Sequence, residues 1–182
     1  MAWAVWFTGL PGSGKTTIVR ATKKHLESGG ISARVLELDE IRKVLTPEPK
    51  YSEEERTIVY AALVYMAKLL IDEGMNVIID ATGNLRKYRE NAYAMIENFG
   101  EIYIKCPLPV AMARESGRKA QFAPEDIYRK GKTGKSVTVP GLNVPYEEPL
   151  KPLATIDCEA PPEESGRLAA DAILRKFGGA NG

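Results

Sequence analysis

Eight residues, GLPGSGKT at positions 9–16, constrain the fold of this chain more than any other stretch. They fit the pattern G-x-x-x-x-G-K-[ST], a loop that wraps around phosphate groups when a strand precedes it and a helix follows it. Here the apolar run 2–8 precedes the loop, and a helical pattern runs from Lys15 to about Ser28. The motif therefore predicts a phosphate-binding loop between the first strand and the first helix.

The chemistry of such a loop is the binding of a nucleotide polyphosphate. Glycines let successive backbone N–H groups approach an anion without a Cβ clash, and the helix N-terminus adds partial positive charge. We predict that Lys15 contacts the β- and γ-phosphates of ATP and takes part in catalysis, and that Thr16 places its hydroxyl on Mg²⁺. The predicted ATP-binding residues are Gly9, Leu10, Pro11, Gly12, Ser13, Gly14, Lys15, Thr16, Thr17 and Arg114.

The remainder of the chain alternates between strand and helix patterns. Further strands are predicted at 33–38, 75–80, 101–106 and 153–158, and helices at 53–74, 86–98, 108–116 and 162–177. Strands separated by helices indicate a mainly parallel sheet with helices on both faces. The expected fold class is α/β, a three-layer α/β/α phosphate-loop NTPase fold with a lid segment. Because 182 residues with 44% hydrophobic composition show no linker, we expect one kinase domain over 1–182.

Composition narrows the partners and the compartment. The net charge of +1 provides no overall field that would recruit nucleic acid or an anionic membrane. No apolar run approaches the ~20 residues of a transmembrane helix. Cys106 and Cys158 lie in or beside apolar runs and are predicted to be buried free thiols rather than a disulfide. We therefore expect a cytoplasmic protein that binds a small nucleotide substrate and neither nucleic acid nor membrane.

Two aspartates follow apolar strand patterns, Asp39 after the second predicted strand and Asp80 at the end of the third. The carboxyl ends of parallel strands line the ligand crevice, on the same side as the phosphate loop. Asp39 is a candidate to accept the proton of an attacking hydroxyl, to contact substrate or to hold Mg²⁺, and Asp80 is a candidate Mg²⁺ ligand. The alternatives are a helix N-cap for Asp39 and a turn residue for Asp80.

Arginines near these carboxylates are candidates for binding an anionic substrate. Arg42 follows Asp39 by one helical turn and is predicted to face the same crevice. Arg56, Arg86 and Arg89 are further candidates. For each of these arginines the alternative is a solvated surface position.

A basic, irregular segment completes the predicted machinery. Residues 114–135 carry a net charge of +4, from the basic residues Arg114, Arg118, Lys119, Arg129, Lys130, Lys132 and Lys135 against three acidic ones. The proline- and glycine-rich stretch 117–152 surrounds them. Such a segment, here about 114–147, is typical of a lid that closes over polyphosphate and excludes water. The alternative is a solvated loop.

The absence of an N-K-x-D-like stretch argues against a guanine-nucleotide switch, and one domain with a basic lid favours phosphoryl transfer to a small acceptor. A regulatory ATP-binding module is the alternative from a different class of protein.

Four segments of the chain resemble the adenylyl-sulfate kinase family, whose members phosphorylate the 3′-hydroxyl of adenylyl sulfate with ATP. They are WFTGLPGSGKTT (6–17), YSEEER (51–56), DIYRKGKTG (126–134) and PGLNVPYEEP (140–149). The resemblance implies substrate binding by Asp39, Arg42, Tyr51, Arg56 and Leu142. It also implies ATP and Mg²⁺ as cofactors, a role in sulfate assimilation, and a homodimer.

The chain departs from the family pattern at several positions. The family's D-G-D-N-x-R is Glu37 to Arg42 here, which keeps the second carboxylate and the arginine. Gly83 replaces a serine sometimes proposed to carry phosphate, so direct in-line transfer is the mechanism left. Val137 and Val139 stand where the family has a lysine and a base-stacking aromatic. DATGNLRKYR (80–89) looks more like kinases of sugar or polynucleotide hydroxyls, and such a kinase remains an alternative.

Overall fold

A parallel five-stranded sheet forms the centre of the protein. The computed structural model describes residues 1–116 and 126–178. The strands are β1 (Ala4–Gly9), β2 (Ala33–Glu37), β3 (Asn76–Asp80), β4 (Phe99–Lys105) and β5 (Ala154–Asp157). Their order in the sheet is β2-β3-β1-β4-β5, and every pair is parallel. The motif strand β1 thus lies at the centre, with its carboxyl end beside that of β3.

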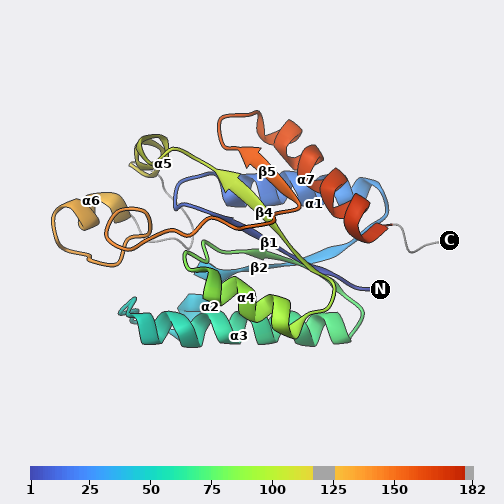
Figure 1. Cartoon of the computed structure of the whole chain (residues 1–182), viewed down its shortest axis with the longest axis horizontal. Coiled ribbons are helices and arrows are strands. Elements are labelled where there is room, and N and C mark those ends of the chain that lie inside the picture. Colours follow the sequence, from blue (N-terminus) through green and yellow to red (C-terminus); the bar gives the residue numbers. More distant parts are fainter. Residues whose placement is uncertain (117–125, 179–182) are drawn as a thin grey trace.

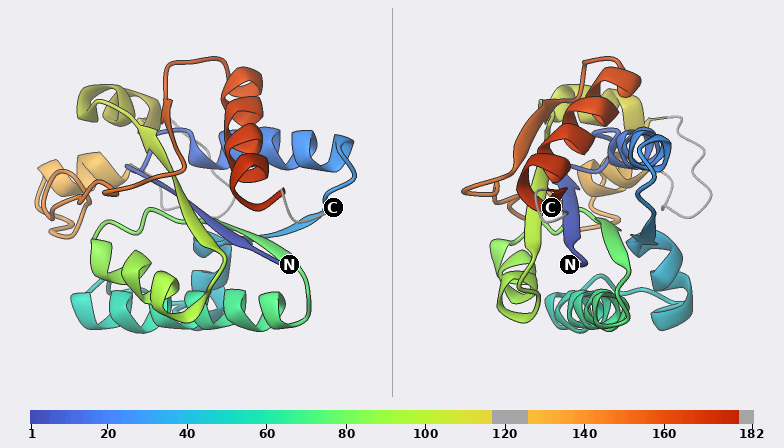
Figure 2. Two further views of the ribbon diagram at one scale, coloured as in Figure 1. Left: turned by 45° about the vertical axis from the view of Figure 1, so that its right-hand side comes forward. Right: turned by 90° about the vertical axis from the view of Figure 1, so that its right-hand side faces the viewer.

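Helices cover both faces of the sheet (Figures 1 and 2). The helices α1 (Lys15–Ser28), α5 (Leu108–Glu115) and α7 (Pro162–Phe177) lie on one side, and α1 packs along α7. The helices α2 (Leu38–Leu45), α3 (Glu53–Asp72) and α4 (Arg86–Met95) lie on the other, where α3 packs on α4. This arrangement confirms the predicted three-layer α/β/α fold.

Alternating side chains of β1 divide the core into two halves. Val5 and Phe7 pack with α1 and α7 on one face, whereas Ala4 and Trp6 pack with α3 and α4 on the other. The side chains of all four residues are fully buried. Burial on both faces explains why β1 reads as a continuous apolar run rather than as an alternating one.

The predicted elements occur with shifts of a few residues at their ends. Helix α1 has the predicted bounds, and Ser52 caps α3 by accepting a hydrogen bond from the Glu55 amide at 3.2 Å. Two short helices had been given no bounds in the prediction: α2, which was implied only by placing Arg42 one helical turn after Asp39, and α6 (Ile127–Lys132), which lies within the stretch expected to be irregular. Cys106 and Cys158 are buried free thiols, as predicted.

The apolar residues Ile58, Ala62, Tyr65 and Leu69 recur along α3 at helical spacing, but they do not form its buried face. Ile58, Tyr65 and Leu69 are exposed, and α3 contacts the sheet through a neighbouring set of apolar residues instead. That buried set is Val59, Tyr60, Leu63, Val64 and Ala67. The helix is apolar around much of its circumference, so spacing alone did not identify the core face.

Candidate active site

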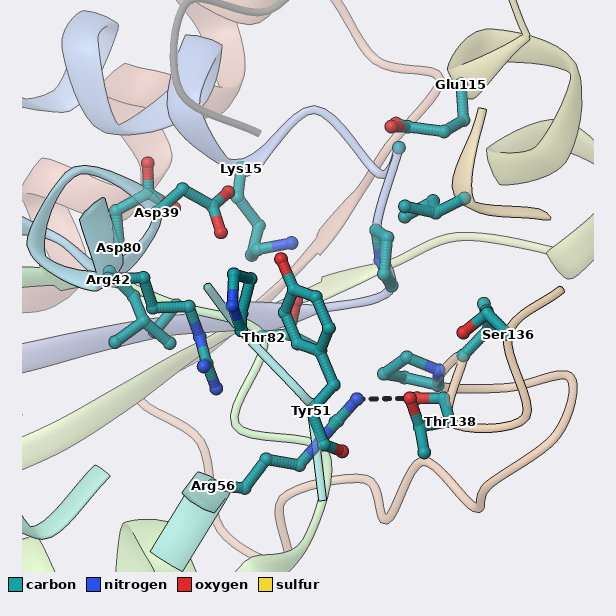
Figure 3. A pocket seen from close by; sticks show the side chains of 18 of the residues that line it. Lys15, Asp39, Arg42, Tyr51, Arg56, Asp80, Thr82, Glu115, Ser136 and Thr138 are labelled. Atoms are coloured by element: carbon teal, nitrogen blue, oxygen red, sulfur yellow. Dashed lines mark hydrogen bonds between the residues drawn. The ribbon is translucent and has the colours of Figure 1, made fainter. Parts of the chain in front are cut away.

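A cavity of about 740 Å³ opens at the carboxyl ends of β1, β2 and β3. Its wall includes the phosphate loop, the beginning of α2, the segment before α3, the end of α5, and residues 135–140. Figure 3 shows Lys15, Asp39 and Asp80 on one side of this cavity and Ser136 and Thr138 on the other, with the ring of Tyr51 between them. The cavity is of the size that encloses small-molecule ligands in enzymes, about 300–1,000 Å³.

The phosphate loop has the backbone that the motif requires. Gly12 has φ of 78°, and a Cβ atom there would lie 2.3 Å from the carbonyl oxygen of Ala111, so only glycine fits. Lys15 Nζ donates hydrogen bonds to the carbonyl oxygens of Gly9 and Leu10, both at 3.0 Å. Of the predicted ATP-binding residues, those that line the cavity are Pro11, Gly12, Gly14, Lys15, Thr16, Thr17 and Arg114.

Three carboxylates meet beside the loop. Asp39 lies in the first turn of α2, Asp80 ends β3 and is buried, and Glu37 immediately precedes α2. All three line the cavity. Burial, followed by the negative charges of Asp80 and Asp39, raises the pKa of Glu37. Glu37, rather than Asp39, occupies the N-cap position of α2, which removes the N-cap alternative for Asp39.

Arg42 and Tyr51 line one wall of the cavity, and Glu55 holds both of them through hydrogen bonds. Arg42 is buried, and its Nη1 donates to Glu55 Oε1 at 2.9 Å. Its guanidinium lies 5.1 Å from the centroid of the Tyr51 ring, a cation–π geometry. Tyr51 has φ of 55°, an uncommon left-handed conformation for a residue with a side chain. Backbone strain of this kind persists where the surroundings enforce it, often at ligand sites.

Arg56 lies further along the same wall and is held by three acceptors. Its Nε donates to the carbonyl oxygen of Tyr51 at 3.2 Å, and its Nη1 donates to Asn84 Oδ1 at 3.2 Å. Its Nη2 donates to the carbonyl oxygen of Thr138 at 2.5 Å, the contact drawn in Figure 3. Arg42, Tyr51 and Arg56 all line the cavity, so the structure brings these predicted substrate residues together.

The other two candidate arginines lie outside the cavity wall. Arg89 is buried, pairs with Glu101 and donates to the carbonyl oxygens of Gly83 and Glu147, so it supports the fold. Arg86 Nε donates to the carbonyl oxygen of Glu148 at 2.9 Å.

The basic segment reaches the cavity at three described positions, Arg114, Lys130 and Lys135. Arg114 Nη1 donates to the carbonyl oxygen of Cys158 at 2.8 Å. Arg118 and Lys119, also predicted in the lid, lie outside the described residues. Leu142 is absent from the wall of the large cavity and lines a second cavity of about 470 Å³, with Leu10, Tyr103 and Cys106.

Sequence reasoning did not single out several wall residues. Glu37, Tyr60, Thr82 and Glu115 line the cavity. For Glu37 and Thr82 a signal was present, since both lie at the carboxyl end of a predicted strand. Tyr60 and Glu115 lie inside helical patterns, where nothing in the sequence marks the face toward the cavity.

The chain matches the adenylylsulphate kinase family over residues 1–157. It is 36% identical to a probable adenylyl-sulfate kinase of Archaeoglobus fulgidus over 159 residues, which cover 87% of this chain and 97% of that one. The chain belongs to the adenylyl-sulfate kinase family. An adenylyl-sulfate kinase of Thermodesulfovibrio yellowstonii is 34% identical over 178 residues, 96% of this chain and 82% of that one.

Solved structures agree with this assignment. The Mycobacterium tuberculosis APS kinase CysC, in complex with AMPPNP and APS, superposes with a TM-score of 0.83 at 28% identity. The match covers 94% of this chain and 97% of that one. A gluconokinase of Sinorhizobium meliloti shares the fold alone, with a TM-score of 0.63 at 20% identity over 95% of this chain and 92% of that one. No helix in residues 1–116 and 126–178 is long and apolar enough to span a membrane.

Two departures from the family pattern have visible structural counterparts. Gly83 has φ of 53°, and a Cβ atom there would lie 2.8 Å from the indole of Trp6, so a side chain at this position requires that the indole move. Val139 is buried and lines the cavity, and Val137 lines it while remaining exposed. Thus the wall opposite Tyr51 is aliphatic at these positions.

Proposed function

We propose that this protein is an ATP-dependent kinase that phosphorylates the 3′-hydroxyl of adenylyl sulfate. One observation supports the proposal most: a single cavity contains both the phosphate loop and the wall formed by Arg42, Tyr51 and Arg56. The chain that forms this cavity belongs to the adenylyl-sulfate kinase family. The loop binds the polyphosphate of ATP, and the two arginines bind the anionic part of the acceptor nucleotide. Tyr51 supplies an aromatic face for the acceptor base.

In this proposal Asp39 accepts the proton of the 3′-hydroxyl as that oxygen attacks the γ-phosphorus. Lys15 leaves the carbonyl oxygens of Gly9 and Leu10 and neutralises charge on the transferring group. Transfer is direct and in line, since Gly83 offers no hydroxyl to carry the phosphoryl group. Lys130, Lys135 and Arg114 close the other side of the cavity and keep water from the γ-phosphate.

The residues at the cavity fit Mg²⁺ as the metal of the nucleotide. Thr16, Asp39 and Asp80 present hydroxyl and carboxylate oxygens to the same cavity, and Mg²⁺ prefers oxygen ligands shared with substrate phosphates. We propose that these three residues hold Mg²⁺. When bound, the ion neutralises charge on the phosphates.

We also propose that the protein is a homodimer in the cytoplasm, in line with the family resemblance. The exposed apolar residues Ile58, Tyr65 and Leu69 on α3 support self-association, and the free thiols support a reducing compartment. Sedimentation velocity of the wild type and of Tyr65→Glu tests this, with a dimer expected only for the wild type.

The test of the catalytic proposal is an acceptor screen with purified protein, ATP and Mg²⁺. Adenylyl sulfate is compared with gluconate, nucleosides and 5′-hydroxyl oligonucleotides at equal concentration. The expected result is the fastest ADP production with adenylyl sulfate and a product phosphorylated at the 3′ position. Faster turnover of any other acceptor contradicts the proposed substrate, and ADP production that needs no acceptor supports an ATP-hydrolysing module instead.

A further inference from the structure

The loop that follows β3 is held at four consecutive backbone carbonyl groups. Trp6 Nε1 donates to the Ala81 carbonyl at 2.8 Å, and Thr8 Oγ1 donates to the Thr82 carbonyl at 2.6 Å. Arg89 donates to the Gly83 carbonyl, and the Glu147 amide donates to the Asn84 carbonyl at 2.7 Å. Because β1, α4 and the 140–149 segment all supply donors, this loop is fixed from three directions.

Asn84 ends this loop with a buried side chain whose amide groups are both used. The residue is 2% exposed. Oδ1 accepts from Arg56 Nη1 at 3.2 Å, and Nδ2 donates to the carbonyl oxygen of Pro145 at 3.1 Å. An amide is suited to this place, since one end must accept from a guanidinium while the other must donate to a carbonyl. A carboxylate or an aliphatic side chain meets only one of these requirements, or neither.

The orientation of the Arg56 guanidinium depends on hydrogen-bond acceptors such as Asn84 Oδ1. The three acceptors on Tyr51, Asn84 and Thr138 take three of the five N–H donors of its guanidinium. Within the described part of the chain, two donors remain for a ligand in the cavity that Arg56 lines. Of the three acceptors, only Asn84 belongs to the loop that the central strand fixes. Asn84 therefore links the guanidinium of Arg56 to the loop that β1 holds.

We propose that Asn84 is a positioning residue of the acceptor site, which orients Arg56 and couples it to the 145–147 segment. Asn84 does not line the cavity, so it acts through Arg56 rather than by touching substrate. The proposal rests on the proposed role of Arg56 in binding the acceptor. It predicts an effect on the acceptor and little effect on ATP, because the phosphate loop has no bond to Asn84.

The experiment compares Asn84→Ala with Asn76→Ala. Asn76 is a matched control because its side chain also uses both ends of its amide: it accepts a hydrogen bond from the Trp3 amide and donates one to the Ser32 carbonyl. It is the first residue of β3, whereas Asn84 lies in the loop after the last residue of that strand. In Asn84→Ala we expect the KM for adenylyl sulfate to rise about tenfold, with the KM for ATP within about twofold of the wild type. In Asn76→Ala we expect both KM values to stay within about twofold, with a lower Tm.

A double-substitution comparison separates positioning from general support. If Asn84 acts through Arg56, adding Asn84→Ala to Arg56→Ala should change the KM for adenylyl sulfate by less than about twofold. Should Asn84→Ala fail to fold, Asn84→Leu replaces it, because it fills a similar volume and offers Arg56 no acceptor; its KM for adenylyl sulfate should again rise about tenfold. An unchanged KM in folded Asn84→Leu would then contradict the proposal.

Two results overturn the inference. One is an unchanged KM for adenylyl sulfate in folded Asn84→Ala. The other is that Asn84→Ala raises this KM as much in the Arg56→Ala protein as it does in the wild type. If the wild type prefers a different acceptor, the proposed substrate is wrong. The same comparison of KM values, made with that other acceptor, then tests the role of Asn84 independently.

Discussion

At the scale of single residues, Lys15 is the candidate catalytic residue of the phosphate loop. Its ammonium is hydrogen-bonded to two carbonyl oxygens of its own loop. Phosphate oxygens are stronger acceptors, so the lysine is expected to exchange these partners on binding ATP. Lys15→Ala should lower kcat by at least ~10²–10³-fold, the usual cost of losing one donor to the transition state.

The measurement is ADP production by Lys15→Ala, with circular dichroism to establish folding. Lys23→Ala on the same helix is the control, since Lys23 forms an exposed ion pair with Glu27. Near-normal turnover by a folded Lys15→Ala protein would contradict the role of this lysine.

Asp39 and Asp80 are both placed to receive a proton or a metal, and substitution separates their roles. Asp39→Asn keeps the shape of the side chain and removes its charge. We expect kcat to fall by ~10²–10⁴-fold, the range for a general base. Calorimetric binding of adenylyl sulfate should change little, because Arg42 and Arg56 remain. Unchanged kcat in Asp39→Asn together with its loss in Asp80→Asn would transfer the role of base to Asp80.

The raised pKa of Glu37 predicts how the stability of the fold depends on pH. Its raised pKa means that the folded chain keeps a proton at pH values where the unfolded chain has already released it. The free energy of unfolding therefore falls as the pH rises from the unfolded pKa through the folded one. Glu37→Gln removes this loss, so its Tm should exceed that of the wild type near pH 7 and equal it below about pH 4. Thermal scans across this range check the prediction, and a constant Tm difference would contradict it.

Site residues could be predicted from the sequence where the residues that act together are also close together along the chain. The phosphate loop could be predicted because its glycines, lysine and threonine act within eight consecutive positions. Arg42 and Arg56 could be named as candidate substrate-binding residues through the family resemblance. The Asn84–Arg56 contact could not be predicted, since it joins residues 28 positions apart through the packing of β3 against α3.

At the scale of elements, the first turn of α3 anchors the cavity wall formed by Arg42, Tyr51 and Arg56. Glu55 accepts from Arg42 Nη1 at 2.9 Å, from the Lys50 amide at 2.6 Å and from the Tyr51 amide at 3.3 Å. Glu55→Ala leaves the Arg42 charge buried without its partner. We expect a loss of about 3 kcal/mol in the free energy of unfolding, the lower end for a broken buried ion pair.

Because Arg42 and Tyr51 lose a common anchor, Glu55→Ala should also raise the KM for adenylyl sulfate. Urea unfolding and steady-state kinetics measure the two effects. Glu54→Ala is the matched control, an exposed glutamate in the same turn, where a change within about 0.5 kcal/mol is expected. An equal effect of both substitutions would show that the turn, and not the Glu55 contacts, is responsible.

The elements missed in the sequence share a physical cause. Helices α2 and α6 span 8 and 6 residues, so apolar periodicity is a weak signal in both, and α2 lacks the proline that marks the start of the equally short α5. Helix α2 follows β2 directly, so its first residues read as a continuation of the strand. The longer helices were predicted because their apolar residues recur over several turns, as in α3.

At the scale of the whole molecule, charge is distributed unevenly even though the total is close to zero. The chain carries a net charge of +1, whereas the cavity wall holds seven lysines and arginines against four aspartates and glutamates. These basic residues are Lys15, Arg42, Lys50, Arg56, Arg114, Lys130 and Lys135. A charged cleft steers small ions through its local field, and salt screens that field.

This imbalance predicts association that depends on ionic strength in a protein that is nearly neutral. The value of kcat/KM for adenylyl sulfate should fall as salt rises, because both substrates are anions. Replacing Lys130 and Lys135 together by alanine should lower kcat/KM at low salt and make kcat/KM less dependent on salt.

The control is the joint replacement of Lys68 and Lys176 by alanine, which changes the net charge by the same amount. They lie toward the carboxyl ends of α3 and α7, at the far end of the molecule from α6 (Figure 1). If both pairs of substitutions change the salt dependence equally, net charge and not the cavity governs association. If only Lys130 and Lys135 matter, the basic segment recruits the substrates that it then encloses.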